Sequence, residues 1–168
     1  MNKEANEVIK ALGLEPHPEG GFFKETYRSS GKIPKAALGE DFAGDRNYCT
    51  AICFLLLPGN FSAFHRLRQD EIWHYYSGSP VYVHVIDKQG NYTRHTVGSD
   101  IKNGEVPQLT VRAGCWFASS VKEGSGYSLT GCTVSPGFDF ADFELAKREE
   151  LVKAYPQHEQ IIRQLTRK

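Results

Sequence analysis

Apolar and polar residues alternate with a period of two through most of the central part of the chain, the pattern of β-strands with one face turned to a core. In the first such segment the alternation places Phe23, Glu25 and Tyr27 on one face. The next run, Asn47–Leu57, is apolar at both parities, as expected for a strand covered on both faces. Further strand-like segments, separated mostly by turn residues, are Ser62–Arg68, Glu71–Tyr76, Val81–Asp87, Tyr92–Val97, Gln108–Val111, Trp116–Ser120 and Tyr127–Val134. Many short strands at this spacing predict a mainly β sandwich or barrel rather than an α/β fold.

Helical spacing is confined to the two ends of the chain. The apolar residues of Lys3–Leu12 fall on one side of a helix, and Gly13 ends it. Near the other end, Phe143–Tyr155 and Gln157–Arg167 carry helical spacing and are separated by Pro156, which does not continue a helix. We therefore expect a β core with short helices packed on its outside.

The segment Ser29–Arg46 is rich in Gly, Lys and Asp and has no sustained period, so it is expected to be a long loop or a mobile flap near the barrel mouth. The chain contains no internal repeat and no low-complexity linker. Its 168 residues suffice for one core that buries about 70% of the extended-chain surface. We expect one domain over residues 1–168.

Charge and hydropathy narrow the range of partners. Lys and Arg together number 20, as do Asp and Glu, so the formal net charge is zero, and the basic surface that nucleic-acid binding usually needs is missing. The stretch Met1–Ala11 carries four charged residues where a signal peptide would need an apolar core, and no later apolar run approaches membrane-spanning length. The sequence predicts a soluble cytoplasmic protein without a nucleic-acid or membrane partner.

The four cysteines, Cys49, Cys53, Cys115 and Cys132, lie in or beside apolar runs and form no CxxC pair. Neither a zinc knuckle nor a redox motif is therefore indicated. We interpret all four as buried free thiols, because free cysteine behaves as a small apolar residue.

Polar chemistry concentrates in Gly59–Gly78, GNFSAFHRLRQDEIWHYYSG. If Arg68–Asp70 forms a hairpin turn, one face carries Phe61, Ala63, His65 and Leu67 on one strand, and Glu71, Trp73 and Tyr75 on its neighbour. His65 and Glu71 would then meet inside an aromatic-lined cavity. Burying Glu71 without a partner would cost several kcal/mol or raise its pKa, and His65 is the partner in reach.

Aromatic residues on the same strands favour a slot for a planar ligand. Trp73, Tyr75, Trp116 and Phe117 are predicted to line it, since aromatic faces stack on purines, pyrimidines and sugar rings. An ordinary core role is the alternative for these residues. Two more residues, Glu25 and Tyr27, share a face with Phe23 and are expected at the same cavity, although Glu25 is also consistent with a solvated strand position. The remaining polar groups are expected outside it: His74 outward by parity, Arg66 and Arg68 at a rim or dimer contact, and His17, His95 and His158 at the surface.

The spacing of this stretch resembles the first motif of the cupin superfamily, in which Gly, two His, Glu and Gly recur at fixed intervals. Gly59, His65, Glu71 and Gly78 match it, while Leu67 stands at the second histidine. The second motif, Pro-x-Gly-x-x-His, aligns with Arg112, Gly114 and Phe117, so its histidine is replaced by phenylalanine. Half of the usual metal-ligand set is therefore missing.

The wider sequence is similar to one cupin family of unknown function found in bacteria and fungi. The resemblance is carried by HPEGGFFKETYRSS at 17–30, FHRLRQDEIWHYYSG at 64–78, AGCWFA at 113–118 and GCTVSPGFDFADFEL at 131–145. It implies a double-stranded β-helix, a cupin jelly-roll barrel, that commonly forms a homodimer and encloses a pocket of small-molecule size. It also implies distant likeness to nucleotide-sugar epimerases and to plant storage and auxin-binding cupins, and it names no reaction.

Three functional interpretations stay open. The first is a binding protein for a sugar, nucleotide-sugar or nucleobase-like ligand, held by the aromatic residues around His65 and Glu71. The second is an isomerase or epimerase, in which His65 takes a proton next to a carbonyl and Tyr75 or Tyr27 returns one. The third is a divalent-metal enzyme with His65 and Glu71 as ligands and with substitutes for the missing ones, for which Glu25, His74 and His84 are the nearest residues.

Overall fold

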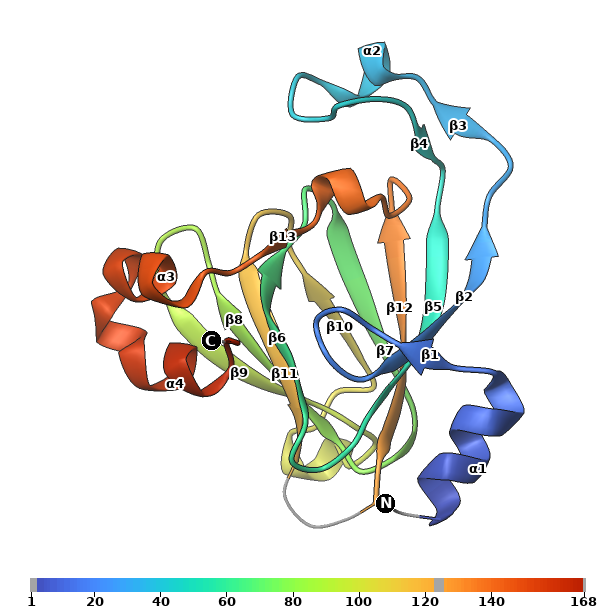
Figure 1. Ribbon diagram of the computed structural model, residues 1–168, viewed down its shortest axis with the longest axis vertical. Coiled ribbons are helices and arrows are strands. Elements are labelled where there is room, and N and C mark those ends of the chain that lie inside the picture. Colours follow the sequence, from blue (N-terminus) through green and yellow to red (C-terminus); the bar gives the residue numbers. More distant parts are fainter. Residues whose placement is uncertain (1–2, 123–125, 168) are drawn as a thin grey trace.

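The computed structural model describes residues 3–122 and 126–167, which fold into two antiparallel β-sheets packed face to face, with helices on their outer faces (Figure 1). The six-stranded sheet consists, in spatial order, of β1 (Glu15–Pro16), β2 (Phe22–Arg28), β5 (Thr50–Leu56), β12 (Ser128–Ser135), β7 (Asp70–Gly78) and β10 (Gln108–Val111). The five-stranded sheet consists of β13 (Glu144–Leu145), β6 (Phe61–Arg66), β11 (Trp116–Val121), β8 (Val81–Ile86) and β9 (Tyr92–Val97). The predicted mainly β jelly-roll barrel is confirmed.

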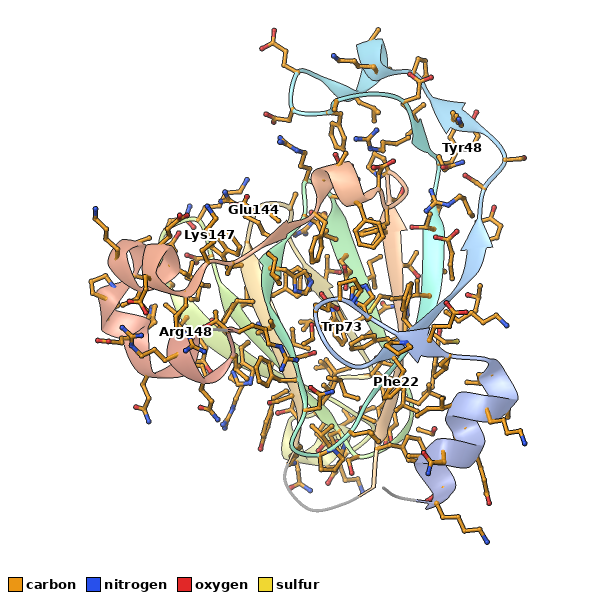
Figure 2. All side chains as sticks on the ribbon, viewed as in Figure 1. Phe22, Tyr48, Trp73, Glu144, Lys147 and Arg148 are labelled. Atoms are coloured by element: carbon orange, nitrogen blue, oxygen red, sulfur yellow. The ribbon has the colours of Figure 1, made fainter. Side chains whose placement is uncertain are left out.

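The core between the sheets is built from alternate residues of both, as the period of two requires. Phe54 and Trp73 of the six-stranded sheet and Val83 and Phe117 of the five-stranded sheet belong to one buried cluster. Trp73 lies in the middle of the barrel, between the two sheets (Figure 2). The inward faces therefore supply both the core and, at one end, the cavity described below.

Helices cover the outside of each sheet. Helix α1 (Lys3–Leu12) packs Ala5 against the outer face of the six-stranded sheet. The C-terminal helices are α3 (Arg148–Ala154), η3 (Pro156–His158) and α4 (Glu159–Gln164), and two further short 3-10 helices are η1 (Ile101–Asn103) and η2 (Phe140–Asp142). The C-terminal helices pack Leu151 and Ile162 on the outer face of the five-stranded sheet. Of the helices in the described part of the chain, none has the length and apolar character to cross a membrane.

The C-terminal region differs from its prediction at one point. The helix expected over Phe143–Tyr155 begins only at Arg148, and the residues before it include the short strand β13, which pairs with β6. This edge pairing extends the five-stranded sheet, so hydrogen bonds to a neighbouring strand override the local helical spacing. The preceding segment, Gly137–Phe143, crosses between the sheets and borders the cavity.

The segment Ser29–Arg46 stands away from the barrel (Figure 1). It contains a two-stranded ribbon of β3 (Lys32–Ile33) and β4 (Arg46–Asn47), with α2 (Lys35–Leu38) between them. At its base the buried guanidinium of Arg46 donates to both carboxylate oxygens of Asp142, at 2.6 and 2.7 Å. This buried pair ties the projecting segment to the chain that borders the cavity.

Candidate functional site

A cavity of about 300 Å³ lies between the two sheets and opens at one end of the barrel. Side chains of both sheets, of the loop before β2 and of the segment after β12 line it. They are His17, Glu19, Phe23, Glu25, Arg28, Ile52, Phe54, His65, Leu67, Glu71, Trp73, Cys132, Phe138, Asp139, Phe140 and Phe143. Its walls are mainly aromatic and aliphatic, and its inner polar groups are carboxyl and imidazole side chains.

His65 and Glu71 both line this cavity, as predicted, but from opposite sheets rather than from neighbouring strands. His65 lies on β6 of the five-stranded sheet and pairs with Phe117 of β11. Glu71 lies on β7 of the six-stranded sheet, between Val134 and Val111. The chain between them therefore crosses from one sheet to the other instead of forming a two-stranded hairpin. Both side chains are buried, with 3% and 8% of their residues' surface exposed.

The nearest partner of His65 is Glu19, a residue that the sequence analysis did not single out. The Nδ1 atom of His65 lies 2.7 Å from the carbonyl oxygen of Ala63 and 3.0 Å from Oε2 of Glu19. Both neighbours are hydrogen-bond acceptors, so Nδ1 carries the proton and Nε2 is the nitrogen left for a ligand. The arrangement is a carboxylate–imidazole dyad.

Glu19 is brought to His65 by a tight loop between β1 and β2. Gly20 and Gly21 adopt φ angles of +117° and +80°, which favour glycine. A Cβ atom on Gly20 would lie 2.1 Å from the carbonyl oxygen of Phe61, so no other residue fits there without displacing the loop. The carbonyl of Glu19 accepts hydrogen bonds from the Ala63 amide, at 3.0 Å, and from the Arg167 guanidinium, at 3.3 Å.

His17, which was expected at the surface, lines the cavity instead. Its side chain is only 8% exposed, and its ring packs edge-on against Phe23 with the ring centroids 4.6 Å apart. The Nδ1 atom of His17 accepts a hydrogen bond from the Glu19 amide at 3.2 Å. Burial lowers the pKa of His17, so this imidazole is neutral near pH 7.

Burial and the charges of neighbouring groups shift the pKa values of His65 and Glu19. Burial alone would lower the pKa of His65, but the Glu19 carboxylate outweighs it and the pKa is raised. Burial alone would raise the pKa of Glu19, and the charge and hydrogen bond of His65 reverse this and lower it. Glu19 is therefore ionised beside an imidazole that holds its proton strongly.

Glu71 differs from Glu19 because no cation among the described residues pairs with it directly. Burial raises its pKa to about 7, with the nearby charge of His65 acting in the opposite direction. The Cys132 thiol and the Trp73 indole lie close enough to offset part of this increase, although the indole N–H has no hydrogen bond of good geometry among the described residues. Burial and the neighbouring Glu71 raise the pKa of Cys132 well above its ordinary value, so its thiol stays protonated.

The structure brings some of the other predicted residues to the cavity. Trp73 and Glu25 line it, and Phe117 lies directly behind His65, with the ring centroids 4.1 Å apart. Glu25 sits at the mouth and accepts two hydrogen bonds from Arg28, both at 2.8 Å. Tyr27 is not at the cavity, because an extra residue in β2 between Glu25 and Tyr27 breaks the alternation and leaves Tyr27 54% exposed.

Three further predicted residues also lie outside the cavity. Trp116 faces the C-terminal helices, where the Arg66 guanidinium lies 4.4 Å from its ring centroid. Trp116 precedes Phe117 on the same strand, so only one of them faces inward. Tyr75 lies further along β7 than Trp73, and its hydroxyl donates to the carbonyl of Gly78 at 2.6 Å, outside the cavity lining. Phe61 likewise faces Arg167, because β6 is irregular between Ser62 and His65.

The donor set does not fit a bound metal. Among the residues that the structure describes, no group of three or more His, Cys, Asp and Glu side chains is arranged to hold a metal ion. His74 bonds to Thr133 at 3.0 Å, and His84 bonds to Tyr92 at 2.8 Å and Ser120 at 3.2 Å, so neither substitutes for the missing ligands. Leu67 lines the cavity with an apolar side chain.

The chain matches one known protein family over most of its length. The family described as "Cupin superfamily (DUF985)" matches residues 6–146. The chain is 33% identical over 156 residues to the uncharacterized protein YML079W of Saccharomyces cerevisiae, covering 88% of this chain and 77% of that protein. It is 40% identical to a hypothetical protein from Leishmania major, with a TM-score of 0.89 over 98% of this chain and 99% of that one. It is also 40% identical to protein SO0799 from Shewanella oneidensis, with a TM-score of 0.87 over 99% and 98% of the two chains.

Proposed function

Because the chain belongs to the Cupin superfamily (DUF985), we propose that the cavity between its sheets is an active site where His65 and Glu71 transfer protons on a small bound molecule. The observation that carries this proposal is the Glu19–His65 dyad, which shares one cavity with a second carboxyl group whose pKa is about 7. Acid–base catalysis is most effective when the pKa values of the groups lie near the working pH.

Each group has a distinct role in this proposal. In the molecules in which His65 is neutral, its Nε2 takes a proton from a carbon next to a carbonyl group, and the ionised Glu19 stabilises the positive charge that develops on the imidazole. The electron pair left by that proton forms a carbon–carbon double bond, and the protonated Glu71 donates its proton to the carbonyl oxygen. The product is an enol, and reversal of both transfers returns the carbonyl compound. Isomerisation results when the proton returns to a different atom or face.

The size of the cavity limits the molecule that reacts. A dry cavity of about 150 Å³ accommodates benzene, so about 300 Å³ has room for one ring with substituents or a short chain. A nucleotide-sugar would have to extend through the mouth past Phe140, which is 56% exposed. The proposal therefore favours a single sugar, a keto compound or one planar ring over a larger ligand.

Deuterium exchange tests this function directly. The wild-type protein is incubated in D2O with a panel of small enolisable ketones and lactones, and NMR measures deuterium incorporation at the carbon next to the carbonyl. We expect exchange with at least one compound and its loss in His65→Ala, with His74→Gln as the control because His74 lies on the opposite face of the sheet. Exchange that persists in His65→Ala would remove His65 as the base. Binding without any exchange would favour a binding protein over an enzyme.

The pH profile of exchange provides a second test. The rate should fall above about pH 7 as Glu71 loses its proton and should fall at low pH as His65 becomes protonated. In Glu71→Gln the amide still donates a hydrogen bond but does not titrate, so the decrease above pH 7 should disappear. A decrease that stays at the same pH in Glu71→Gln would assign it to another group.

A further inference from the structure

The positively charged side chains at the cavity are already matched by carboxylates. The Arg28 guanidinium donates two hydrogen bonds to Glu25, one to Asn47 at 2.8 Å and one to the Phe138 carbonyl at 3.1 Å. His65 is paired with Glu19 at 3.0 Å. Among the described residues that line the cavity, no unpaired cation is left to bind an anionic group.

Carboxyl groups are in excess over these cations. Glu71 lines the inner part of the cavity and has no paired cation in the part of the chain that the structure describes. Asp139 lies near the mouth, where its carboxylate accepts a hydrogen bond from the Ala141 amide at 2.8 Å. A phosphate or carboxylate that enters the cavity therefore loses its hydration without gaining an opposite charge. Repulsion from the Asp139 carboxylate at the mouth adds to that cost.

Hydrogen-bond donors, by contrast, are available at the inner end. The indole of Trp73 is 1% exposed and lines the cavity, and its N–H has no hydrogen-bond partner of good geometry among the described residues. Buried donors normally have a partner, and an unsatisfied one is costly. Glu71 lies two positions before Trp73 on the same face of β7, and in its protonated form it offers a second donor.

We infer that the cavity binds an uncharged planar molecule whose carbonyl oxygen accepts a hydrogen bond from the Trp73 indole N–H, and that it excludes anions. This inference rests on the proposed function and specifies its substrate class. The aromatic rings of Phe23, Phe54 and Phe143 at the walls favour a flat molecule. A cationic ligand is disfavoured because an ammonium or amidinium group has no acceptor atom for the Trp73 N–H.

Three probes of nearly equal shape test whether the cavity prefers a neutral, an anionic or a cationic ligand. Benzamide is neutral, benzoate is an anion and benzamidine is a cation. Each fits a cavity of about 300 Å³, and isothermal titration calorimetry or protein-observed NMR gives the dissociation constants at pH 6. We expect benzamide to bind at least about tenfold more tightly than benzoate or benzamidine. Stronger binding of either charged probe, or no binding of any of the three at millimolar concentration, would overturn the inference.

Two further measurements locate the carbonyl contact. Trp73→Phe keeps an aromatic ring but removes the N–H, and it should weaken benzamide binding about fivefold to tenfold. Trp116→Phe, which changes the tryptophan on the outside of the barrel, is the matched control. The second measurement uses the wild-type protein, so it does not depend on whether a variant folds. Benzamide affinity should fall about tenfold from pH 6 to pH 8 as the protonated fraction of Glu71 decreases. Affinity that is independent of both pH and Trp73 would refute the contact.

These outcomes are distinguishable from failure of the proposed reaction. Benzamide has no hydrogen on the carbon next to its carbonyl, so its binding reports the recognition of a neutral acceptor without any proton transfer from carbon. Tight benzamide binding without deuterium exchange into any enolisable compound would leave the substrate class standing and remove the reaction. Deuterium exchange into a carboxylate-bearing compound, together with weak benzamide binding, would support the reaction and remove the proposed substrate class.

Discussion

Replacing Glu71 by glutamine should change how the stability of the protein depends on pH. The carboxyl group of Glu71 has a pKa of about 7 in the folded chain, against an ordinary value of 4.5. A raised carboxyl pKa means that the folded state holds the proton more strongly than the unfolded state does. The free energy of unfolding of the wild type therefore falls as the pH rises from about 4.5 to about 7, and this contribution is constant at higher pH.

The size of the effect follows from the difference between these pKa values. Each pKa unit corresponds to about 1.36 kcal/mol, so Glu71 lowers the free energy of unfolding by about 3 kcal/mol between pH 4.5 and pH 8.5. Glu71 is only 8% exposed, so solvent screening does not remove most of this cost. Glu71→Gln carries no titrating group at this position. Relative to wild type, it should gain about 3 kcal/mol over the same interval, or about 6 to 12 °C in Tm.

Urea unfolding at a series of pH values from 4.5 to 8.5 measures this difference. Glu7→Gln, on the exposed side of α1, serves as the control, and its difference from wild type should stay level across the series. If the difference between Glu71→Gln and wild type is also constant within about 0.5 kcal/mol, Glu71 is not a desolvated carboxyl group. The proton donor in the proposed reaction would then have to be another residue.

Three other variants, one of them a double substitution, test the remaining parts of the site. Glu19→Gln should lower the pKa of the His65 imidazole measured by NMR, because the carboxylate that raises it is removed; an unchanged value would show that the dyad is not formed. Arg167→Met should lower the pKa of His65 because it removes a hydrogen bond to the Glu19 carbonyl. The control Arg163→Met breaks only exposed ion pairs and should leave the pKa of His65 unchanged. Equal changes in this pKa in both variants would refute a positioning role for Arg167. Leu67→His combined with Phe117→His should create a site that binds about one equivalent of zinc by metal analysis, because Leu67 lines the cavity with His65 and Glu71 and the Phe117 ring contacts His65. No gain in bound zinc over wild type would show that these positions do not face a common point.

The short, regularly spaced strands predicted a mainly β sandwich or barrel, the resemblance to cupins specified the jelly-roll barrel, and alternation along the strands predicted most of the inward residues. Leu67, Trp73 and Phe117 all lie in the core between the sheets, as a period of two requires. The prediction failed for Tyr27 because β2 contains an extra residue between Glu25 and Tyr27. A bulge reverses the faces of all later residues in a strand, and the alternation itself carries no sign of it.

The polar centre of the site was predicted only in part, because its contacts are distant in the sequence. His65 and Glu71 were correctly expected in one cavity, but their strands belong to different sheets. Glu19 lies 46 positions before His65, in a loop with no periodic pattern. Only the adjacent glycines at 20 and 21 indicated an unusual backbone there.

The Glu19–His65 geometry is set mainly by backbone hydrogen bonds, which explains why the side-chain pattern did not predict it. One residue, Ala63, holds both members of the dyad: its amide donates to the carbonyl of Glu19, and its carbonyl accepts from Nδ1 of His65. The loop reaches Ala63 only because Gly20 passes so close to β6 that a Cβ atom would lie 2.1 Å from the Phe61 carbonyl oxygen.

Gly20→Ala should therefore displace Glu19 and lower the pKa of His65 while the barrel stays folded. Gly39→Ala is the matched control, because Gly39 also has a positive φ, of +85°, but a Cβ atom there meets nothing within 4 Å. Both variants carry the backbone strain of a side chain at positive φ, about 1 kcal/mol or more, so their Tm values should both decrease. Only Gly20→Ala should change the NMR titration of His65. An equal change in both variants, or none in either, would show that the tight passage of this loop does not position the dyad.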